Sequence, residues 1–141
     1  MFNRTLLTLI IQRAVAWSVG MASVDEIVTL NIRGANLLAM RRAVEALESI
    51  DYVLVDAWTI PGIKIPQRGI IRGDLSVKSI AAASIIAKVT RDRIMRQLAQ
   101  EFPEYGFDIH KGYATKRHRT AIALYGSCPH HRLQFLSSQP L

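Results

Sequence analysis

The sequence predicts an α/β domain, because short hydrophobic strands alternate with helical segments along its 141 residues. Half of the residues are hydrophobic, which suffices for a packed core and argues against disorder. No internal repeat, low-complexity tract or linker interrupts the alternation. We therefore expect residues 1–141 to form a single domain in which helices flank a sheet.

The first 56 residues are expected to form two strands and three helices. Ser23 and Asn31 are residue types that cap helices, and Asp25 and Glu26 suit the first helical turn. A short apolar run with β-branched residues predicts a buried strand that ends at Asp56. The expected order is helix 3–14, strand 14–19, helices 24–29 and 32–49, and strand 52–55.

The rest of the chain is expected to be mainly helical. Pro61, Gly62 and Pro66 mark a loop, and Pro103 ends the longest helical pattern. Gly126 ends the last one. The expected order is strand 69–72, helix 77–101, a glycine- and aromatic-rich loop over 104–114, and helix 115–125.

The positive charge is concentrated in the C-terminal half. Residues 1–63 hold five Lys or Arg and six Asp or Glu, whereas residues 64–141 hold thirteen and five. A basic half indicates a polyanionic partner such as nucleic acid, or a merely basic surface. No apolar run approaches the roughly 20 residues that a membrane-spanning helix needs. One cysteine, Cys128, excludes a disulfide framework and suits a reducing compartment.

Two carboxylates are candidates for metal chemistry. Asp56 follows a strand, where it can bind a hard cation or simply cap the following turn. Asp92 lies one helical turn from Lys88 and from Arg96. That spacing fits a solvated salt-bridge ladder or a metal-proximal acid among phosphate-binding bases.

Other polar residues admit two interpretations each. Ser79 belongs to a stripe of small residues that suits close packing, and its hydroxyl could instead bind phosphate. Lys111 and Tyr113 lie in the predicted loop, where lysine suits phosphate and tyrosine can stack on a base or be buried. We interpret His130-His131-Arg132 as a basic surface patch, because no Cys/His spacing supports zinc.

The ordered set of motifs resembles the ribonuclease HII family over about residues 8–135. The matching segments are Val53–Asp56, Gly73-Asp74, Ser79–Met95, Tyr105–Phe107, His110–Thr115, His118, Tyr125-Gly126 and His131-Arg132. The resemblance implies a ribonuclease H-like fold, with a mixed sheet flanked by helices and a C-terminal helical part. It also implies an endonuclease that hydrolyses the RNA strand of RNA–DNA hybrids and cuts 5′ of ribonucleotides in duplex DNA.

The same resemblance assigns roles to individual residues. Asp56 and Asp92 match two catalytic acids that bind Mg²⁺ or Mn²⁺, and Tyr113 matches the tyrosine that stacks at the ribonucleotide junction. Substrate contacts are expected from Lys88, Lys111, Ser79 and Arg91. The implied partner is an RNA–DNA hybrid or a ribonucleotide-containing duplex. We expect no membrane association and no obligate protein partner, and a location in the cytoplasm.

The sequence also departs from the family pattern. The family opens with a strand carrying Asp-Glu-x-Gly-Arg-Gly, and residues 1–30 contain no match to it. We interpret Asp25-Glu26 as helix-start acids. We therefore expect an N-terminally incomplete domain without the first strands, whose cleavage is impaired because two acids are absent. The alternative is a catalytically inactive basic fragment that binds duplexes. Ala57 stands where the family usually has glycine.

Overall fold

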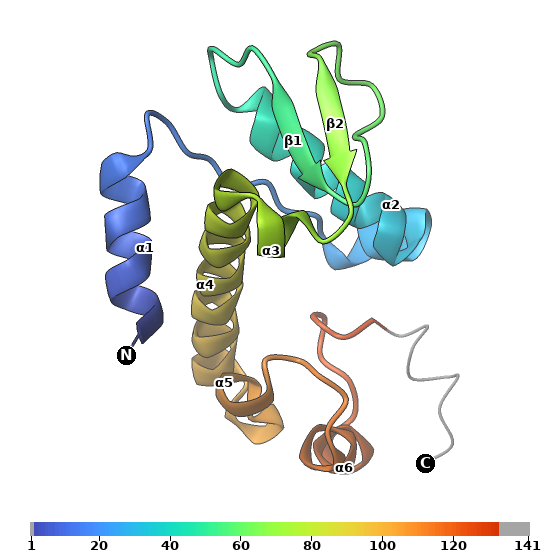
Figure 1. Ribbon diagram of the computed structural model, residues 1–141. Coiled ribbons are helices and arrows are strands. Elements are labelled where there is room, and N and C mark those ends of the chain that lie inside the picture. The colour runs from blue at the N-terminus through green and yellow to red at the C-terminus, as the bar shows by residue number, and fades with distance from the viewer. Residues whose placement is uncertain (1, 133–141) are drawn as a thin grey trace. The chain divides into compact units, whose positions relative to one another are not determined.

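The computed structural model describes residues 2–132 and confirms the α/β class (Figure 1). The chain divides after Val89 into two compact units, and the longest helix, α4, begins in the first and ends in the second. The described elements, in order, are α1 (Phe2–Arg13), α2 (Val24–Glu45), β1 (Val53–Asp56), β2 (Gln67–Ile70), α3 (Gly73–Ser76), α4 (Lys78–Glu101), a 3₁₀ turn η1 (Pro103–Tyr105), α5 (Phe107–His110) and α6 (Lys116–Tyr125).

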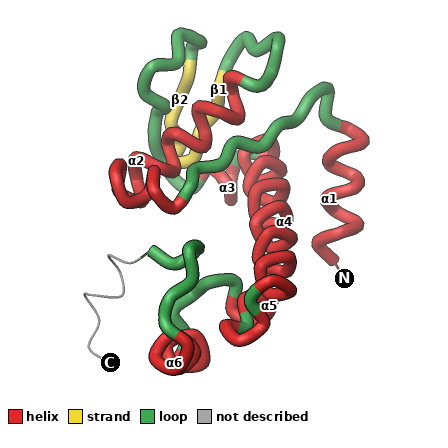
Figure 2. Tube along the Cα trace, turned by 180° about the vertical axis from the view of Figure 1, so that it is seen from behind, coloured by secondary structure: helices red, strands yellow, loops and turns green. Residues whose placement is uncertain are grey.

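The first unit contains a parallel pair of strands covered on one face by α2, as Figures 1 and 2 both show. β1 and β2 pair in a register that sets Val53 opposite Gln67 and Asp56 opposite Ile70. Val53 and Val55 are buried, whereas Leu54 between them is 40% exposed. The strand therefore alternates between a packed face and an exposed face, as strand geometry allows. The expectation of a buried strand is correct for one face only.

Two apolar clusters hold the first unit together. In one, Val53, Val55 and Ile60 are buried against α2 and the following loop, with Met40, Val44, Ile50, Ile63 and Ile65 packed around them. In the other, Leu7 of α1 meets Ile86 and Val89 of α4. Burial of such side chains contributes roughly 1.5–3 kcal/mol each relative to exposure.

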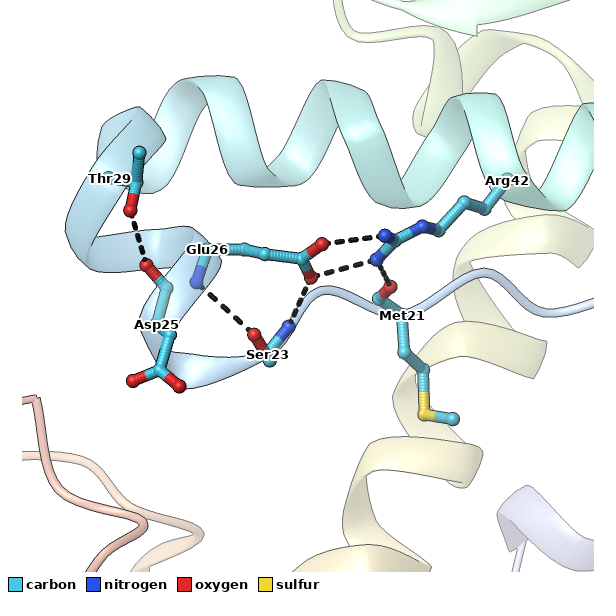
Figure 3. Close-up of polar contacts among 6 residues, drawn as sticks. All are labelled: Met21, Ser23, Asp25, Glu26, Thr29 and Arg42. Atoms are coloured by element: carbon cyan, nitrogen blue, oxygen red, sulfur yellow. Dashed lines mark hydrogen bonds and ion pairs between the residues drawn. The ribbon is translucent and has the colours of Figure 1, made fainter.

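The start of α2 is fixed by a capping box, which Figure 3 shows. The Ser23 hydroxyl accepts from the Glu26 N–H at 3.2 Å, and the Glu26 carboxylate accepts from the Ser23 N–H at 2.8 Å. Arg42 donates to both Glu26 oxygens and to the Met21 carbonyl. This guanidinium holds the pKa of Glu26 down at about 2, so Glu26 serves as a capping acid that is ionised at neutral pH.

A second cap lies inside α2, where the sequence predicted a new helix to begin. Asn31 has non-helical backbone angles (φ 59°, ψ 174°), and its side-chain oxygen accepts from the N–H groups of Arg33 and Gly34. The expected pair of helices is therefore present, joined end to end across this kink.

Residues 14–19 do not form the expected strand. The segment is irregular and passes along α2, where the Ser18 hydroxyl donates to the Ala43 carbonyl. A Cβ on Gly20 would lie 1.9 Å from the Ala39 carbonyl oxygen, so only glycine permits this close approach.

The turn after β1 is tightly held. Ala57 adopts a left-handed conformation (φ 63°), its N–H donates to the Ile70 carbonyl, and the Trp58 N–H donates to the Asp56 carbonyl. β2 ends at Ile70, two residues before Arg72, which is also left-handed (φ 53°). The second strand consequently lies at 67–70 in place of the expected 69–72.

The second unit is built on the end of α4 and on α6. The predicted ends of both helices are confirmed, with Pro103 following α4, Thr115 capping α6 and Gly126 closing it. The expected loop over 104–114 contains η1 and α5. The core consists of Tyr105, Phe107, Ala121 and Cys128, packed against Met95, Leu98, Ala99, Phe102 and Ile122.

Within the described residues, none of the helices combines the length and the apolar character that crossing a membrane requires.

Replacing Ala57 by glycine should stabilise the protein by about 1 kcal/mol, because a left-handed conformation strains a residue that carries a Cβ. Chemical denaturation should show a higher midpoint for Ala57→Gly. The control is Ala87→Gly on the exposed side of α4, which should lower the free energy of unfolding by roughly 1 kcal/mol. Equal effects of both substitutions would contradict the strain at Ala57.

Candidate functional site

Asp56 is the last residue of β1, and its carboxylate is held in place by the chain that follows β2. The side-chain oxygen Oδ1 accepts from the Gly73 N–H at 2.8 Å, and the residue is half-buried. The backbone of Asp56 is fixed on both sides by strand pairing and by the Ala57 turn. A half-buried carboxylate with a fixed orientation is suited to bind a cation.

Four candidate residues lie on α4. Ser79 and Lys88 are exposed in the part that belongs to the first unit. Arg91 is exposed and Asp92 half-buried in the part that belongs to the second unit. The structure thus assigns Asp56 and Asp92 to different units.

The structure brings Arg91, Lys111 and Tyr113 together in the second unit. The Arg91 guanidinium donates to the Lys111 carbonyl at 2.7 Å and lies 5.2 Å from the centre of the Tyr113 ring, within cation–π range. The Tyr113 side chain is 66% exposed, which overturns the alternative of a buried tyrosine. An exposed aromatic ring beside an arginine is an arrangement that can stack on a nucleotide.

The backbone at residues 111–112 is left-handed at two successive positions. Lys111 has φ 52° and Gly112 has φ 79°. A Cβ on Gly112 would lie 3.2 Å from the Met95 methyl carbon and 3.8 Å from Arg91 Nη2. The Lys111 ammonium group donates to the Asp108 carbonyl with one of its three N–H groups.

The donor chemistry of the two acids fits a hard divalent cation, since carboxylate oxygens are what Mg²⁺ and Mn²⁺ prefer. Asp56 can offer its remaining carboxylate lone pairs, because the Gly73 N–H uses only one acceptor position. Across residues 2–132, no three His, Cys, Asp or Glu side chains converge into a group that could hold a metal. Each acid therefore qualifies as a single ligand and not as part of a complete centre within its own unit.

Two buried histidines, His118 and His131, form a hydrogen-bonded chain that ends at Tyr113, and their partners assign the ring protons. The Cys128 N–H donates to His131 Nδ1 at 2.9 Å, so the His131 proton is on Nε2 and is donated to His118 Nε2, also at 2.9 Å. The His118 proton is then on Nδ1 and is donated to the Tyr113 carbonyl at 3.0 Å.

The third histidine, His110, is satisfied in the same way. Its Nδ1 accepts from the Gly112 N–H at 3.2 Å, and its Nε2 donates to the Tyr105 carbonyl at 2.7 Å. The rings of His110 and His118 are stacked, with their centres 4.3 Å apart. Both ring nitrogens of all three residues are therefore used.

The surroundings of His118 and His131 disfavour the protonated form of both rings, because the pKa of each is lowered. Burial lowers the pKa of His118, and burial together with the neighbouring His118 lowers the pKa of His131. A proton added to either ring would place two N–H groups face to face at the His118–His131 contact, or block the acceptor of the Cys128 N–H. The neutral rings are thus part of the local fold.

The interpretation of His130-His131-Arg132 as a surface patch is wrong for its central residue. His130 is exposed, but His131 is 7% exposed and lies in the aromatic core. Sequence reasoning missed it because His118, the ring to which His131 is hydrogen-bonded, lies 13 positions away along the chain. The usable signal was the presence of four histidines within residues 110–131 beside two glycines and two tyrosines.

Comparison with known proteins gives a consistent result. A family model described as Ribonuclease HII matches residues 3–138. Proteins named Ribonuclease HII are 48% identical over 130 residues in Cupriavidus necator, 49% over 134 residues in Clostridioides difficile and 54% over 123 residues in Myxococcus xanthus.

These alignments cover 89%, 94% and 86% of this chain, and 55%, 52% and 42% of the respective relatives. The chain therefore spans about half the length of the curated relatives it matches.

The stability of the second unit should fall as the pH decreases below about 6.5, the usual pKa of histidine. The folded pKa values of His118 and His131 are lowered, so the unfolded chain binds protons first and stability is lost toward those lower values. Urea denaturation between about pH 8 and pH 5 measures this slope.

His131→Asn should flatten that pH dependence, because asparagine keeps an acceptor for the Cys128 N–H and has no titrating ring. His130→Asn, at the exposed neighbouring position, is the matched control and should leave the slope unchanged. A slope that His130→Asn removes and His131→Asn retains would contradict the assignment.

Proposed function

Since the chain belongs to the ribonuclease HII family, we propose that this protein hydrolyses the RNA strand of RNA–DNA hybrids and cuts 5′ of ribonucleotides in duplex DNA. The observation that carries the proposal is the family match over residues 3–138. The exposed Tyr113 ring beside Arg91 and the oriented Asp56 carboxylate support it, because both are site residues that the resemblance assigns. The basic C-terminal half supplies charge for a polyanionic duplex.

Each site residue has a proposed task. Asp56 and Asp92 would hold Mg²⁺ or Mn²⁺, which when bound activates water and stabilises the leaving oxygen of the phosphodiester. Tyr113 would stack on the nucleotide at the ribonucleotide junction. The cations Lys88, Arg91 and Lys111 would contact phosphates, with the Ser79 hydroxyl as a further donor.

Tested alone, the 141-residue polypeptide is proposed to cleave weakly. The resemblance assigns it two carboxylates of a four-acid site, and the described residues contain no group of three potential ligands. We further propose that residues 1–141 belong to one ribonuclease HII-type domain, in line with the extent of the family match. A cytoplasmic location is proposed as well, which the single cysteine supports.

Replacing Tyr113 by alanine should weaken binding to a DNA duplex with one ribonucleotide by about 5-fold to 150-fold, since aromatic–base stacking is worth ~1–3 kcal/mol. Fluorescence anisotropy at fixed salt measures the Kd. Tyr125→Ala is the matched control, because Tyr125 is 63% exposed and Tyr113 66%. Equal affinities for the two variants would count against Tyr113 as a substrate contact.

Slow cleavage of the same duplex in Mn²⁺ should leave a 3′-hydroxyl and a 5′-phosphate, and should disappear in Asp92→Asn. Asp108→Asn, an exposed acid in α5, is the control and should retain the wild-type rate. Gel analysis of an end-labelled strand gives the rates, with an all-DNA duplex as the blank. Binding without any product would favour the alternative of an inactive duplex-binding protein, and undiminished cleavage by Asp92→Asn would remove Asp92 from the site.

A further inference from the structure

Tyr113 combines an exposed side chain with a backbone that is held at both of its polar groups. Its N–H donates to the His110 carbonyl at 2.9 Å. Its carbonyl accepts from the Thr115 N–H at 2.8 Å and from His118 Nδ1 at 3.0 Å. The ring itself is 66% exposed. The hydrogen bonds therefore fix the backbone from which the Tyr113 side chain extends, and the ring itself stays exposed.

The donor from His118 depends on His131. A neutral imidazole carries one proton, and its position is set by the bond that the other nitrogen makes. Because His131 Nε2 donates to His118 Nε2, the His118 proton is kept on Nδ1, facing the Tyr113 carbonyl. The Cys128 N–H fixes the His131 tautomer in turn. The hydrogen bonds from Cys128 to Tyr113 therefore all donate in the same direction: Cys128 to His131, His131 to His118, and His118 to the Tyr113 carbonyl.

Packing alone does not account for these side chains. Apolar rings of similar size would fill the same space among Tyr105 and Phe107 without the cost of burying polar atoms. The hydrogen bonds of His118 and His131 lead to the carbonyl of Tyr113, a residue whose side chain is exposed. We propose that His118 and His131 are positioning residues that hold Tyr113 in its substrate-contacting position, an inference that rests on the proposed function of Tyr113.

The conservative variants of His118 separate its two bonds. The amide of asparagine reaches the place of Nδ1, so His118→Asn keeps a donor for the Tyr113 carbonyl and loses the acceptor for His131. The amide of glutamine reaches the place of Nε2, so His118→Gln keeps that acceptor and loses the donor. His118→Gln should weaken binding of a duplex with one ribonucleotide about tenfold, the cost of re-ordering one residue's backbone. His118→Asn should remain within about twofold of wild type, because that backbone stays ordered.

A double-mutant cycle distinguishes positioning from general stabilisation. In a Tyr113→Ala background, His118→Gln should cause no further loss of binding, because the group it positions is gone. An equal tenfold loss in that background would overturn the proposal. If Tyr113→Ala by itself binds like wild type, the proposed role of Tyr113 fails, and a ligand-free measurement decides about positioning.

Native-state hydrogen exchange is that measurement. His118→Gln should speed exchange of the Tyr113 and Thr115 amides selectively, leaving the amides of α6 beyond its first turn as protected as in wild type. Uniform acceleration over the second unit would overturn the proposal. If His118→Gln does not fold, His131→Asn takes its place, because it frees the His118 tautomer and should speed exchange at the same two amides. Unchanged exchange there would be equally decisive against it.

Discussion

Exposed functional groups are useful only if the backbone that carries them is fixed, and this requirement governs both units of the protein. Asp56 presents a carboxylate at the end of β1, where pairing with β2 and the Gly73 N–H hold it. Tyr113 presents a ring, and buried histidines hold its carbonyl. In each unit, the parts of the structure that are buried and paired are therefore the ones that orient what is exposed.

Left-handed backbone at residues with side chains is found beside the same groups. Ala57 follows Asp56, Arg72 precedes Gly73, and Lys111 lies two residues before Tyr113. Such conformations cost roughly 1–3 kcal/mol each and persist only where the surrounding contacts enforce them. Their placement means that the sharp turns needed to orient the carboxylate and the ring are maintained by the rest of each unit. The local sequence at these turns does not favour them.

Elements with a local signal could be predicted from the sequence, and contacts between distant residues could not. Ser23, Asn31 and Thr115 cap helices as their types indicate, and Pro103 and Gly126 end them. Residues 14–19 have strand-forming side chains, but they follow α2 because Gly20 permits an approach that no local pattern reveals. The position of Asp56 at a strand end was predictable for the same local reason. The histidine chain was not, since its central hydrogen bond joins His118 to His131, 13 positions apart, and these residues meet only after the second unit has folded.

The sole cysteine of the sequence lies at the far end of that histidine chain. The Cys128 side chain is 7% exposed within the aromatic core, and its N–H is bonded to His131. A thiol reagent can reach the sulfur only when the core beside the histidines opens, so the rate of alkylation reports the frequency of that opening. The alkylation rate of Cys128 therefore measures how often the core behind Tyr113 opens. The measurement needs neither a ligand nor a substitution.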